Sequence, residues 1–253
     1  MKKLISILTF STLLISINNY GNENSLQLKT TTERCPHHIY IGPEIFLFDL
    51  NTHVKNIKID GLKFFAGIRF RYEYLKPKAL YAGVDLFSAV SNKGFHVTSH
   101  RYRFYKNNHV IGFGNFEFRL GYTAAYKNNM ITPFLGIGAY SFGGGAYFSE
   151  CMFYYAAGMR SVFELSQFFT MGLNWKVFHT DDTEQKIKFL LDGRKIKYTD
   201  RDNMWGGEIG VPFVWHIGST KRWDVQLEPY FLKLDFSELQ NIYGTRLLFG
   251  YRF

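Results

Sequence analysis

The chain has 253 residues, of which 46% are hydrophobic and 19% aromatic, and it carries a formal net charge of +9. A helical membrane protein is excluded, because beyond the N-terminus there is no run of about eighteen apolar residues that could cross a bilayer as a helix. The positive charge could suggest nucleic acid, but the sequence has no basic helix and begins with an export signal, so we expect anionic lipid head groups as partners and no nucleic acid.

The N-terminus has the features of a secretory signal. Two lysines follow the initiating methionine, and an apolar run broken only by Ser and Thr extends from Leu4 to Ile17. This run is too short to span a membrane and is typical of a signal peptide. We expect the signal peptide to cover residues 1–21 and a short polar periplasmic lead to cover residues 22–36.

Beyond the lead, ten segments show the two-residue alternation of β-strands, in which successive side chains face opposite sides of a sheet. The mean hydropathy of −0.15 is low because alternation spreads the apolar residues along the chain. The predicted strands are residues 37–49, 62–74, 80–90, 109–124, 131–142, 152–164, 169–179, 205–217, 223–234 and 242–253. Four of them contain a proline, which removes a ladder donor, so we expect Pro43, Pro133, Pro212 and Pro229 near strand ends or bulges.

The connections between these segments alternate in length. Short ones follow the even-numbered strands, at residues 75–79, 125–130, 165–168 and 218–222, and longer ones follow most odd-numbered strands. Short periplasmic turns and long extracellular loops give a transmembrane barrel this rhythm. An even number of strands then places both termini on the periplasmic side.

The two faces of the predicted strands differ in character. One face is apolar and aromatic, and the other carries charged residues and many glycines, which suits a crowded lumen in which charges pair. The 26 Phe and 17 Tyr are attributed to aromatic girdles at the two membrane interfaces. The predicted lumen charge cluster is Arg69, Arg71, Glu73, Asp85, Glu117, Arg119, Lys176, Glu228, Arg246 and Arg252. For Arg246 and Arg252 the candidate acidic partners are Asp85, Glu117 and Glu228.

The fold predicted from these patterns is all-β. It is a closed antiparallel transmembrane β-barrel of about ten strands, within a range of eight to twelve, with periplasmic N- and C-termini. Residues 37–253 form the barrel. We expect no intrachain disulfide, because Cys35 and Cys151 fall at opposite ends of an apolar band about 25 Å tall, although a bridge to another chain stays open. His37 and His38 beside Cys35 are a weak metal signal, so no metal and no cofactor are predicted.

The loop at residues 91–108 mixes basic and aromatic residues. It is either a surface that contacts lipid phosphates or a ligand, or a β-hairpin that extends the barrel beyond the membrane. The candidate interaction residues are His100, Arg101, Arg103 and Tyr105. Histidine and serine lie close together here, but no third group that would orient a hydrolytic pair can be identified.

His179, Asp181 and Asp182 stand where the seventh strand enters the longest loop, an arrangement that resembles the outer rim of the omptin proteases, which are barrels of ten strands. Those enzymes pair Asp-x-His with a second acidic pair, whereas this chain has His-x-Asp, and its second loop supplies no acidic pair. The mixed charges of residues 180–204 favour a solvated loop, and no catalytic residue is assigned.

The last strand alternates up to a terminal aromatic residue, with Phe249, Tyr251 and Phe253 on one face and Arg246 and Arg252 on the other. With the architecture, this ending resembles the small outer-membrane β-barrels, the group of the OmpA membrane domain, OmpX, OmpW and porin-like channels. The resemblance covers residues 37–253. It implies location in the outer membrane, contact with outer-membrane lipid including lipopolysaccharide, and recognition of the three aromatic residues by the barrel assembly machinery.

Three functions are compatible with this class, because the architecture does not fix the function. The first is a structural or surface-interaction barrel with exposed extracellular loops, which we expect to be a monomer and not an enzyme. The alternative is a narrow porin-like channel for passive diffusion of small solutes. An outer-membrane hydrolase is a distant third. About ten strands leave a nearly filled interior, which favours the first function.

Overall fold

The computed structural model describes residues 35–54, 57–91, 96–99, 105–106, 110–144, 148–191, 194–198, 201–218, 220–235 and 239–253. The predicted signal peptide and nearly all of the predicted lead therefore lie outside the described residues. Within them, no helix has the length and apolar character needed to cross a membrane.

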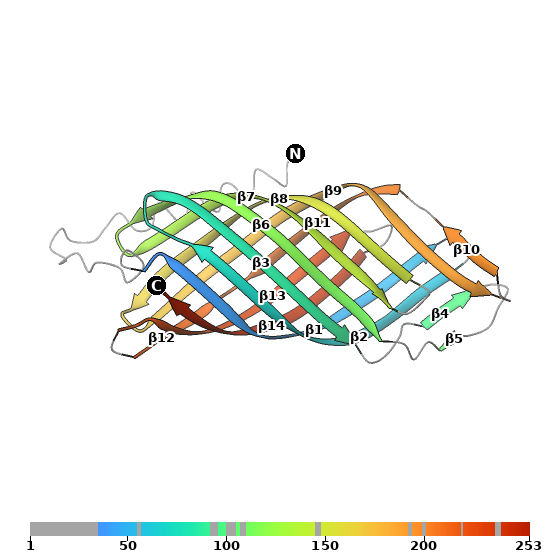
Figure 1. Cartoon of the computed structure of the whole chain (residues 1–253), viewed down its shortest axis with the longest axis horizontal. Coiled ribbons are helices and arrows are strands. Elements are labelled where there is room, and N and C mark those ends of the chain that lie inside the picture. The colour runs from blue at the N-terminus through green and yellow to red at the C-terminus, as the bar shows by residue number, and fades with distance from the viewer. Residues whose placement is uncertain are drawn as a thin grey trace.

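The predicted closed antiparallel barrel of ten strands is confirmed (Figure 1). Neighbouring strands in the chain pair with each other, and β1 also pairs with β14, which closes the sheet. At the seam, the N–H of His37 donates to the carbonyl of Phe253 at 3.2 Å, and the N–H of Phe253 donates back to the carbonyl of His37 at 3.0 Å. The barrel strands are β1 (His37–Val54), β2 (Ile57–Tyr74), β3 (Ala79–Ser91), β6 (Ile111–Tyr126), β7 (Asn129–Gly144), β8 (Phe148–Ser166), β9 (Phe169–Leu191), β11 (Arg201–Gly210) continued by β12 (Phe213–Ile217), β13 (Trp223–Asp235) and β14 (Leu239–Arg252).

The two ends of the barrel differ. Short turns gather at one end, beside the start of β1 and the end of β14, and we call this the turn end (Figure 1). Three of its turns contain a lysine with positive φ: Lys78 at 54°, Lys127 at 52° and Lys221 at 51°. All three lysines lie in connections predicted to be short, but their positive φ is not predictable from residue type, because only a small fraction of residues other than glycine adopt this conformation.

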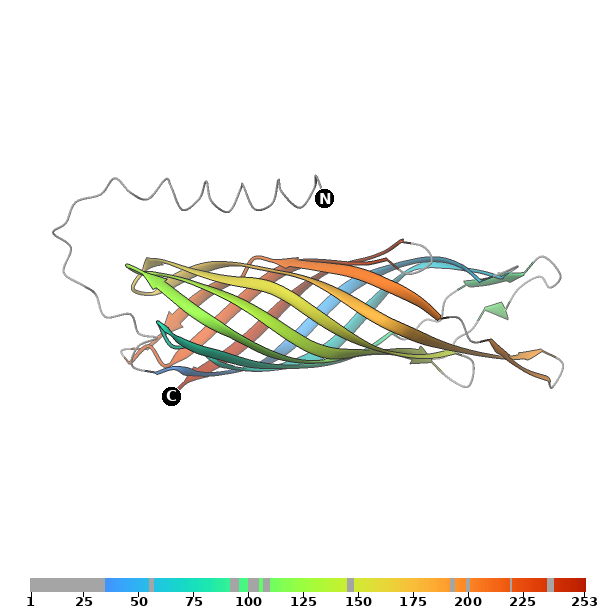
Figure 2. The ribbon, with the colours of Figure 1, turned by 90° about the horizontal axis from the view of Figure 1, so that it is seen from above.

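The opposite end, which we call the loop end, carries the additional strands β4 (His96–Ser99), β5 (Tyr105–Lys106) and β10 (Arg194–Tyr198) (Figure 2). β4 pairs with β2 and β5, and β10 pairs with β9. Parts of the predicted loops at residues 91–108 and 180–204 therefore form β-strands. β9 ends at Leu191 rather than at residue 179, because hairpin hydrogen bonds continue where the bilayer no longer imposes alternation.

One predicted strand is not continuous. Val211 and Pro212 separate β11 from β12, so the segment 205–217 is interrupted at its proline. The backbone stays bonded there, because the N–H of Gly172 donates to the carbonyl of Pro212 at 2.8 Å and the N–H of Val211 donates to the carbonyl of Pro229 at 3.0 Å. Pro43 stays inside β1 and Pro133 inside β7, each at a gap in the pairing with one neighbouring strand.

Candidate functional site in the barrel lumen

The barrel has an apolar outer surface and a polar interior. Large apolar side chains point outward, and Leu80 and Phe153 are each 74% exposed. Charged side chains point inward, and Glu73 and Glu117 are each 0% exposed. A water-soluble barrel has the reverse distribution, whereas a transmembrane barrel presents apolar side chains to lipid. The outer surface is therefore suited to a lipid bilayer.

The middle of the lumen is filled by charged side chains, which we call the ionic layer. Arg246 illustrates the pairing, because its Nη1 donates to Glu228 at 3.1 Å and its Nη2 donates to Glu208 at 2.6 Å. Its Nε also donates to Glu44 at 3.4 Å. The layer consists of Glu44, Arg69, Arg71, Asp85, Glu117, Arg119, Lys176, Glu208, Glu228 and Arg246.

The pairing runs across the lumen as well as between adjacent strands. Arg71 donates to Asp85 on the next strand at 3.0 Å and to Glu228, which is far away in sequence, at 3.1 Å. Arg119 and Lys176 both pair with Glu117. Five basic and five acidic side chains make up the layer, so their formal charges cancel. The free space beside it is about 20 Å³, enough for only a water molecule or two.

On the loop-end side, aromatic rings fill the lumen, and we call them the aromatic layer. The rings of Phe46 and Phe65 stack with centroids 4.9 Å apart, and those of Phe48 and Phe142 stack at 5.3 Å. The layer consists of Phe46, Phe48, Phe65, Phe87, Phe113, Tyr140, Phe142, Tyr154, Phe178 and Tyr230, packed with buried aliphatic side chains. The attribution of the aromatic residues to girdles alone was wrong, because these ten fill the lumen.

The two layers are in direct contact. The guanidinium carbon of Arg246 lies 3.8 Å from the ring centroid of Tyr230, within the range of a cation–π interaction. The Tyr154 hydroxyl donates a hydrogen bond of 2.6 Å to Glu117. The lumen is therefore filled continuously through the ionic and aromatic layers.

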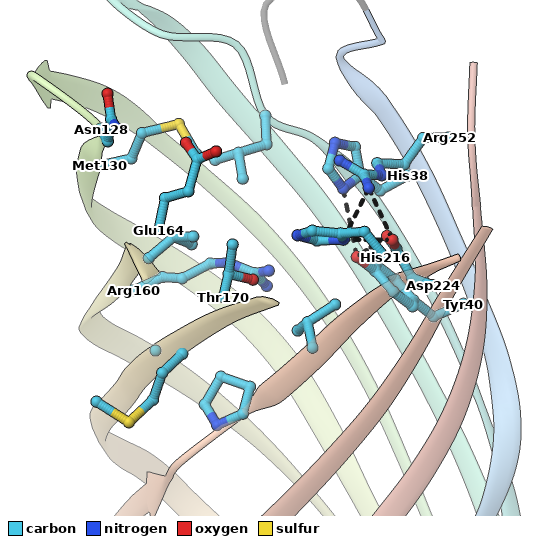
Figure 3. Close-up of a pocket in the computed structure, with 16 residues that line it drawn as sticks. His38, Tyr40, Asn128, Met130, Arg160, Glu164, Thr170, His216, Asp224 and Arg252 are labelled. Carbon is cyan, nitrogen blue, oxygen red and sulfur yellow. Dashed lines mark hydrogen bonds and ion pairs between the residues drawn. The ribbon is translucent and has the colours of Figure 1, made fainter. Parts of the chain in front are cut away.

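The turn end of the lumen holds a third group, which we call the turn-end cluster: His38, Tyr40, His216, Asp224 and Arg252 (Figure 3). Asp224 organises it. Its Oδ1 accepts a hydrogen bond from Arg252 at 2.8 Å and lies 2.7 Å from His216 Nδ1, and its Oδ2 accepts one from the Tyr40 hydroxyl at 3.2 Å. His216 Nδ1 also lies 2.8 Å from Arg252 Nη2, which can only donate, so Nδ1 either donates to Asp224 or accepts from Arg252, depending on the tautomer. The cluster lines a pocket with a free volume of about 40 Å³.

Comparison with known proteins bears on the fold. No protein-family model and no curated protein sequence matches the chain. Among solved structures, the outer-membrane protease OmpT from Escherichia coli is 8% identical, with 86% of this chain and 96% of that chain covered and a TM-score of 0.50. This chain is an outer-membrane β-barrel. The apolar outer surface and the barrel fold together place it in the outer membrane, whereas identity this low carries nothing about activity.

Two further similar structures are barrels of the same general kind. The translocator domain of the autotransporter NalP from Neisseria meningitidis is 10% identical, with 100% of this chain and 97% of that chain covered and a TM-score of 0.43. OprG from Pseudomonas aeruginosa is 10% identical, with 89% of this chain and 99% of that chain covered and a TM-score of 0.40.

All ten charged residues predicted for the lumen lie inside the barrel. Eight belong to the ionic layer, while Glu73 pairs with Arg160 and Arg252 belongs to the turn-end cluster. Of the three acidic partners proposed for Arg246 and Arg252, Glu228 does pair with Arg246. Asp85 and Glu117 pair with other bases, and the acidic partner of Arg252 is Asp224.

Sequence reasoning missed several lumen residues: His38, Glu44, Arg160, Glu208, His216 and Asp224. Alternation could have found most of them. Glu44 lies two residues before the inward Phe46, and Glu208 lies between the inward-facing Gly206 and Gly210, whose added Cβ atoms would meet Phe178 and Glu228. Applying the two-residue period to every strand, rather than to the strands with the strongest contrast, would have assigned both to the lumen.

The proposed assembly residues lie on the outer surface at the turn end. Phe249 and Phe253 are exposed, and the Tyr251 ring packs against Trp223 with centroids 4.8 Å apart. Their recognition by the assembly machinery stays a prediction. Of the loop candidates, His100, Arg101 and Arg103 lie outside the described residues, and Tyr105 belongs to β5 but its side chain is not described.

The remaining candidates are placed as follows. The His179 ring lies 4.5 Å from the Trp205 ring, centroid to centroid, while the side chains of Asp181 and Asp182 are outside the described part of the chain. Cys35 and Cys151 are both free cysteines. Among the described residues, no group of three or more His, Cys, Asp or Glu side chains is arranged to hold a metal ion.

Proposed function

We propose that this protein is a closed outer-membrane barrel that serves as a structural and surface-interaction protein, displaying its loops at the loop end. The observation that carries the proposal is the filled lumen. The ionic layer is charge-balanced and leaves about 20 Å³ free, and the aromatic layer lies directly on top of it. A solute that entered from either end would meet both layers.

Opening this lumen would be energetically expensive. Removing one partner from a buried ion pair costs about 3–5 kcal/mol, and several pairs would have to separate to admit a solute. The aromatic layer would also have to lose close packing. These costs argue against the alternative, a narrow porin-like channel for passive diffusion.

The length of the strands supports a role outside the membrane. A tilted transmembrane strand needs about 9 to 11 residues. β9 has 23 residues, and β1 and β2 have 18 each. The extra residues lie at the loop end, where β2 pairs with β4 in the predicted loop at residues 91–108 and β9 pairs with β10 in the predicted loop at residues 180–204. Those loops are the proposed contact surfaces, with His100, Arg101, Arg103 and Tyr105 as candidate contact residues.

The rest of the proposal concerns the orientation of the barrel, its oligomeric state, its lack of enzymatic activity and its partners. We propose that the turn end faces the periplasm, that the barrel works as a monomer, and that it is not an enzyme. The proposed partners are outer-membrane lipid, including lipopolysaccharide, and the barrel assembly machinery, which would recognise Phe249, Tyr251 and Phe253. Nucleic acid is not a proposed partner. The apolar outer face and the aromatic residues near the turn end support contact with lipid.

Conductance in a planar lipid bilayer tests the closed lumen. Protein whose folding is verified by a mobility shift between unheated and boiled samples should give no discrete conductance steps, while a porin run in parallel gives them. Reproducible steps from the folded protein would refute the structural role and support the narrow channel.

A further inference from the structure

Several buried polar groups around the pocket at the turn end lack a hydrogen-bond partner, as do Glu73 Oε2, Asn174 Oδ1 and Gln226 Oε1 elsewhere in the described part of the barrel. The lining of this pocket includes Arg160, Arg252 and His38, which are 6%, 2% and 5% exposed. Among the described residues, the Nε of Arg160, the Nε of Arg252 and the Nε2 of His38 have no hydrogen-bond partner. No arginine of the ionic layer has such an unpartnered nitrogen within the described part of the chain.

Unpartnered buried groups of this kind are unfavourable. A buried donor without an acceptor loses about 1–3 kcal/mol, and more where the group is charged. The arginines of the pocket are only partly engaged, because Arg160 donates to Glu73 through Nη1 and Arg252 donates to Asp224 through Nη2. The Nε–H of each of these two guanidinium groups is buried and has no acceptor among the described residues.

The arrangement of the lining selects the ligand chemistry. Guanidinium N–H groups bind the oxygens of carboxylates and phosphates with the strongest protein hydrogen bonds. Two acidic residues line the pocket (Figure 3). Glu164 lies beside Met130 and Asn128, on the far side of the pocket from His38 and Arg252. Asp224 already accepts a hydrogen bond from Arg252 Nη2, so an anion beside Arg252 must bind through the guanidinium N–H groups that Asp224 does not occupy.

We propose that this pocket is a binding site for a small free oxyanion, a phosphate or a carboxylate, that enters from the turn end. The ionic layer closes the other side, so entry is from the turn end. A bilayer lipid lies outside the barrel wall, and a free volume of about 40 Å³ suits a single oxyanion group rather than a head group with its chains.

The test uses the full chain, folded in a maltoside detergent that carries no phosphate, with inorganic phosphate titrated calorimetrically in a chloride buffer. We expect saturable binding at one site. Arg160→Gln should weaken binding by at least about tenfold, or about 1.4 kcal/mol. Arg160→Lys should give an intermediate loss, because it keeps the charge beside Glu73 but lacks the Nε donor. A parallel titration with acetate distinguishes a carboxylate site from one that requires phosphate.

Two further variants separate binding from folding. Val214→Phe fills the pocket without removing a charge and should abolish binding. Arg222→Gln removes an exposed arginine from the same end, outside the pocket, and should leave binding unchanged. All variants must show the heat-dependent mobility shift. The proposal is overturned if the wild-type protein shows no saturable binding of either anion, if Val214→Phe still binds, or if Arg222→Gln weakens binding as much as Arg160→Gln does.

Discussion

The ionic layer and the aromatic layer fill the same lumen with opposite chemistry. They occupy the same set of inward positions, often two residues apart on one strand, as Glu44 and Phe46 do on β1 and Lys176 and Phe178 do on β9. The free space beside the ionic layer is about 20 Å³. The comparison shows that the lumen of this barrel is filled in two ways. Charged side chains fill it where each charge has a partner, and aromatic side chains fill it where the rings pack closely.

The two layers should fail in different ways. The ionic layer depends on partners, because a charge left unpaired in a buried site is strongly destabilising. The aromatic layer depends on volume, because a cavity forfeits the contacts of all the atoms that lined it. Substitutions that remove a charge therefore test the ionic layer, and substitutions that remove side-chain volume test the aromatic layer.

The largest effect is expected from Arg246→Leu. This substitution removes the base that pairs with Glu44, Glu208 and Glu228, and leaves three carboxylates short of a partner. We expect the free energy of unfolding to fall by about 5 kcal/mol, the upper end of the range for a broken buried pair. Urea unfolding from detergent micelles measures it.

Arg222→Leu is the matched control, because it makes the same change of residue type at an exposed arginine in a turn at the turn end, outside the ionic layer. Its unfolding free energy should stay within about 0.5 kcal/mol of the wild type. Equal losses in the two variants would mean that the ionic layer contributes nothing specific to stability.

Phe113→Ala should give the next largest loss, about 3–4 kcal/mol. Phe113 is central to the aromatic layer, with ring centroids 5.6 Å from Phe46 and 5.7 Å from Tyr140. The control is Phe116→Ala on the same strand, whose ring faces outward. Its free energy of unfolding should fall only by the free energy of transferring the ring from water to an apolar environment, about 1.5–3 kcal/mol. Equal losses would show that the inward rings are not closely packed.

The alternating pattern predicted the barrel because the bilayer imposes it. Wherever a strand crosses lipid, its outward side chains must be apolar, and the ten predicted segments follow that rule. Outside the bilayer the rule no longer holds. The ends of β1, β2 and β9 at the loop end, together with β4, β5 and β10, were therefore placed in loops.

The lumen was predictable only in part, and for a related reason. Charged residues on inward faces stand out in the sequence, so Arg69, Arg71 and Asp85 were identified. Inward aromatic residues such as Phe65 and Phe178 do not stand out, although alternation puts them on the same faces as Arg69 and Lys176. Their close packing depends on which rings and glycines approach from other strands, and a single strand's pattern does not contain that information.

One such approach gives the third prediction, for Gly206→Ala. A Cβ at Gly206 would lie 2.2 Å from the Phe178 ring, so glycine is needed for the ring to reach its position. We expect Gly206→Ala to destabilise the barrel by about 2 kcal/mol through overpacking. Gly207→Ala is a control one residue away, because the nearest atom to its Cβ would be 3.5 Å distant. Similar urea midpoints for the two variants would contradict close packing around Phe178.

The smallest expected effect concerns the contact between the layers. Tyr154 belongs to the aromatic layer, and its hydroxyl donates a hydrogen bond of 2.6 Å to Glu117 in the ionic layer. Tyr154→Phe keeps the ring and removes this bond together with the contact of 2.9 Å from the hydroxyl to Asn115 Oδ1, so we expect a loss of about 1 kcal/mol in the free energy of unfolding. Tyr140→Phe removes a hydroxyl from the ring stacked on Tyr154 at 4.9 Å and leaves the bond to Glu117 in place, so its loss should be smaller.

A double-mutant cycle decides whether that bond couples the layers. Glu117 also pairs with Arg119 and Lys176, so Glu117→Gln alone weakens the ionic layer, and the cycle isolates the part that depends on Tyr154. If the layers are coupled through this bond, Tyr154→Phe should have a smaller effect in the Glu117→Gln background than in the wild type, by about 0.5 kcal/mol or more. Additive losses would instead mean that the layers are adjacent but energetically independent at this contact.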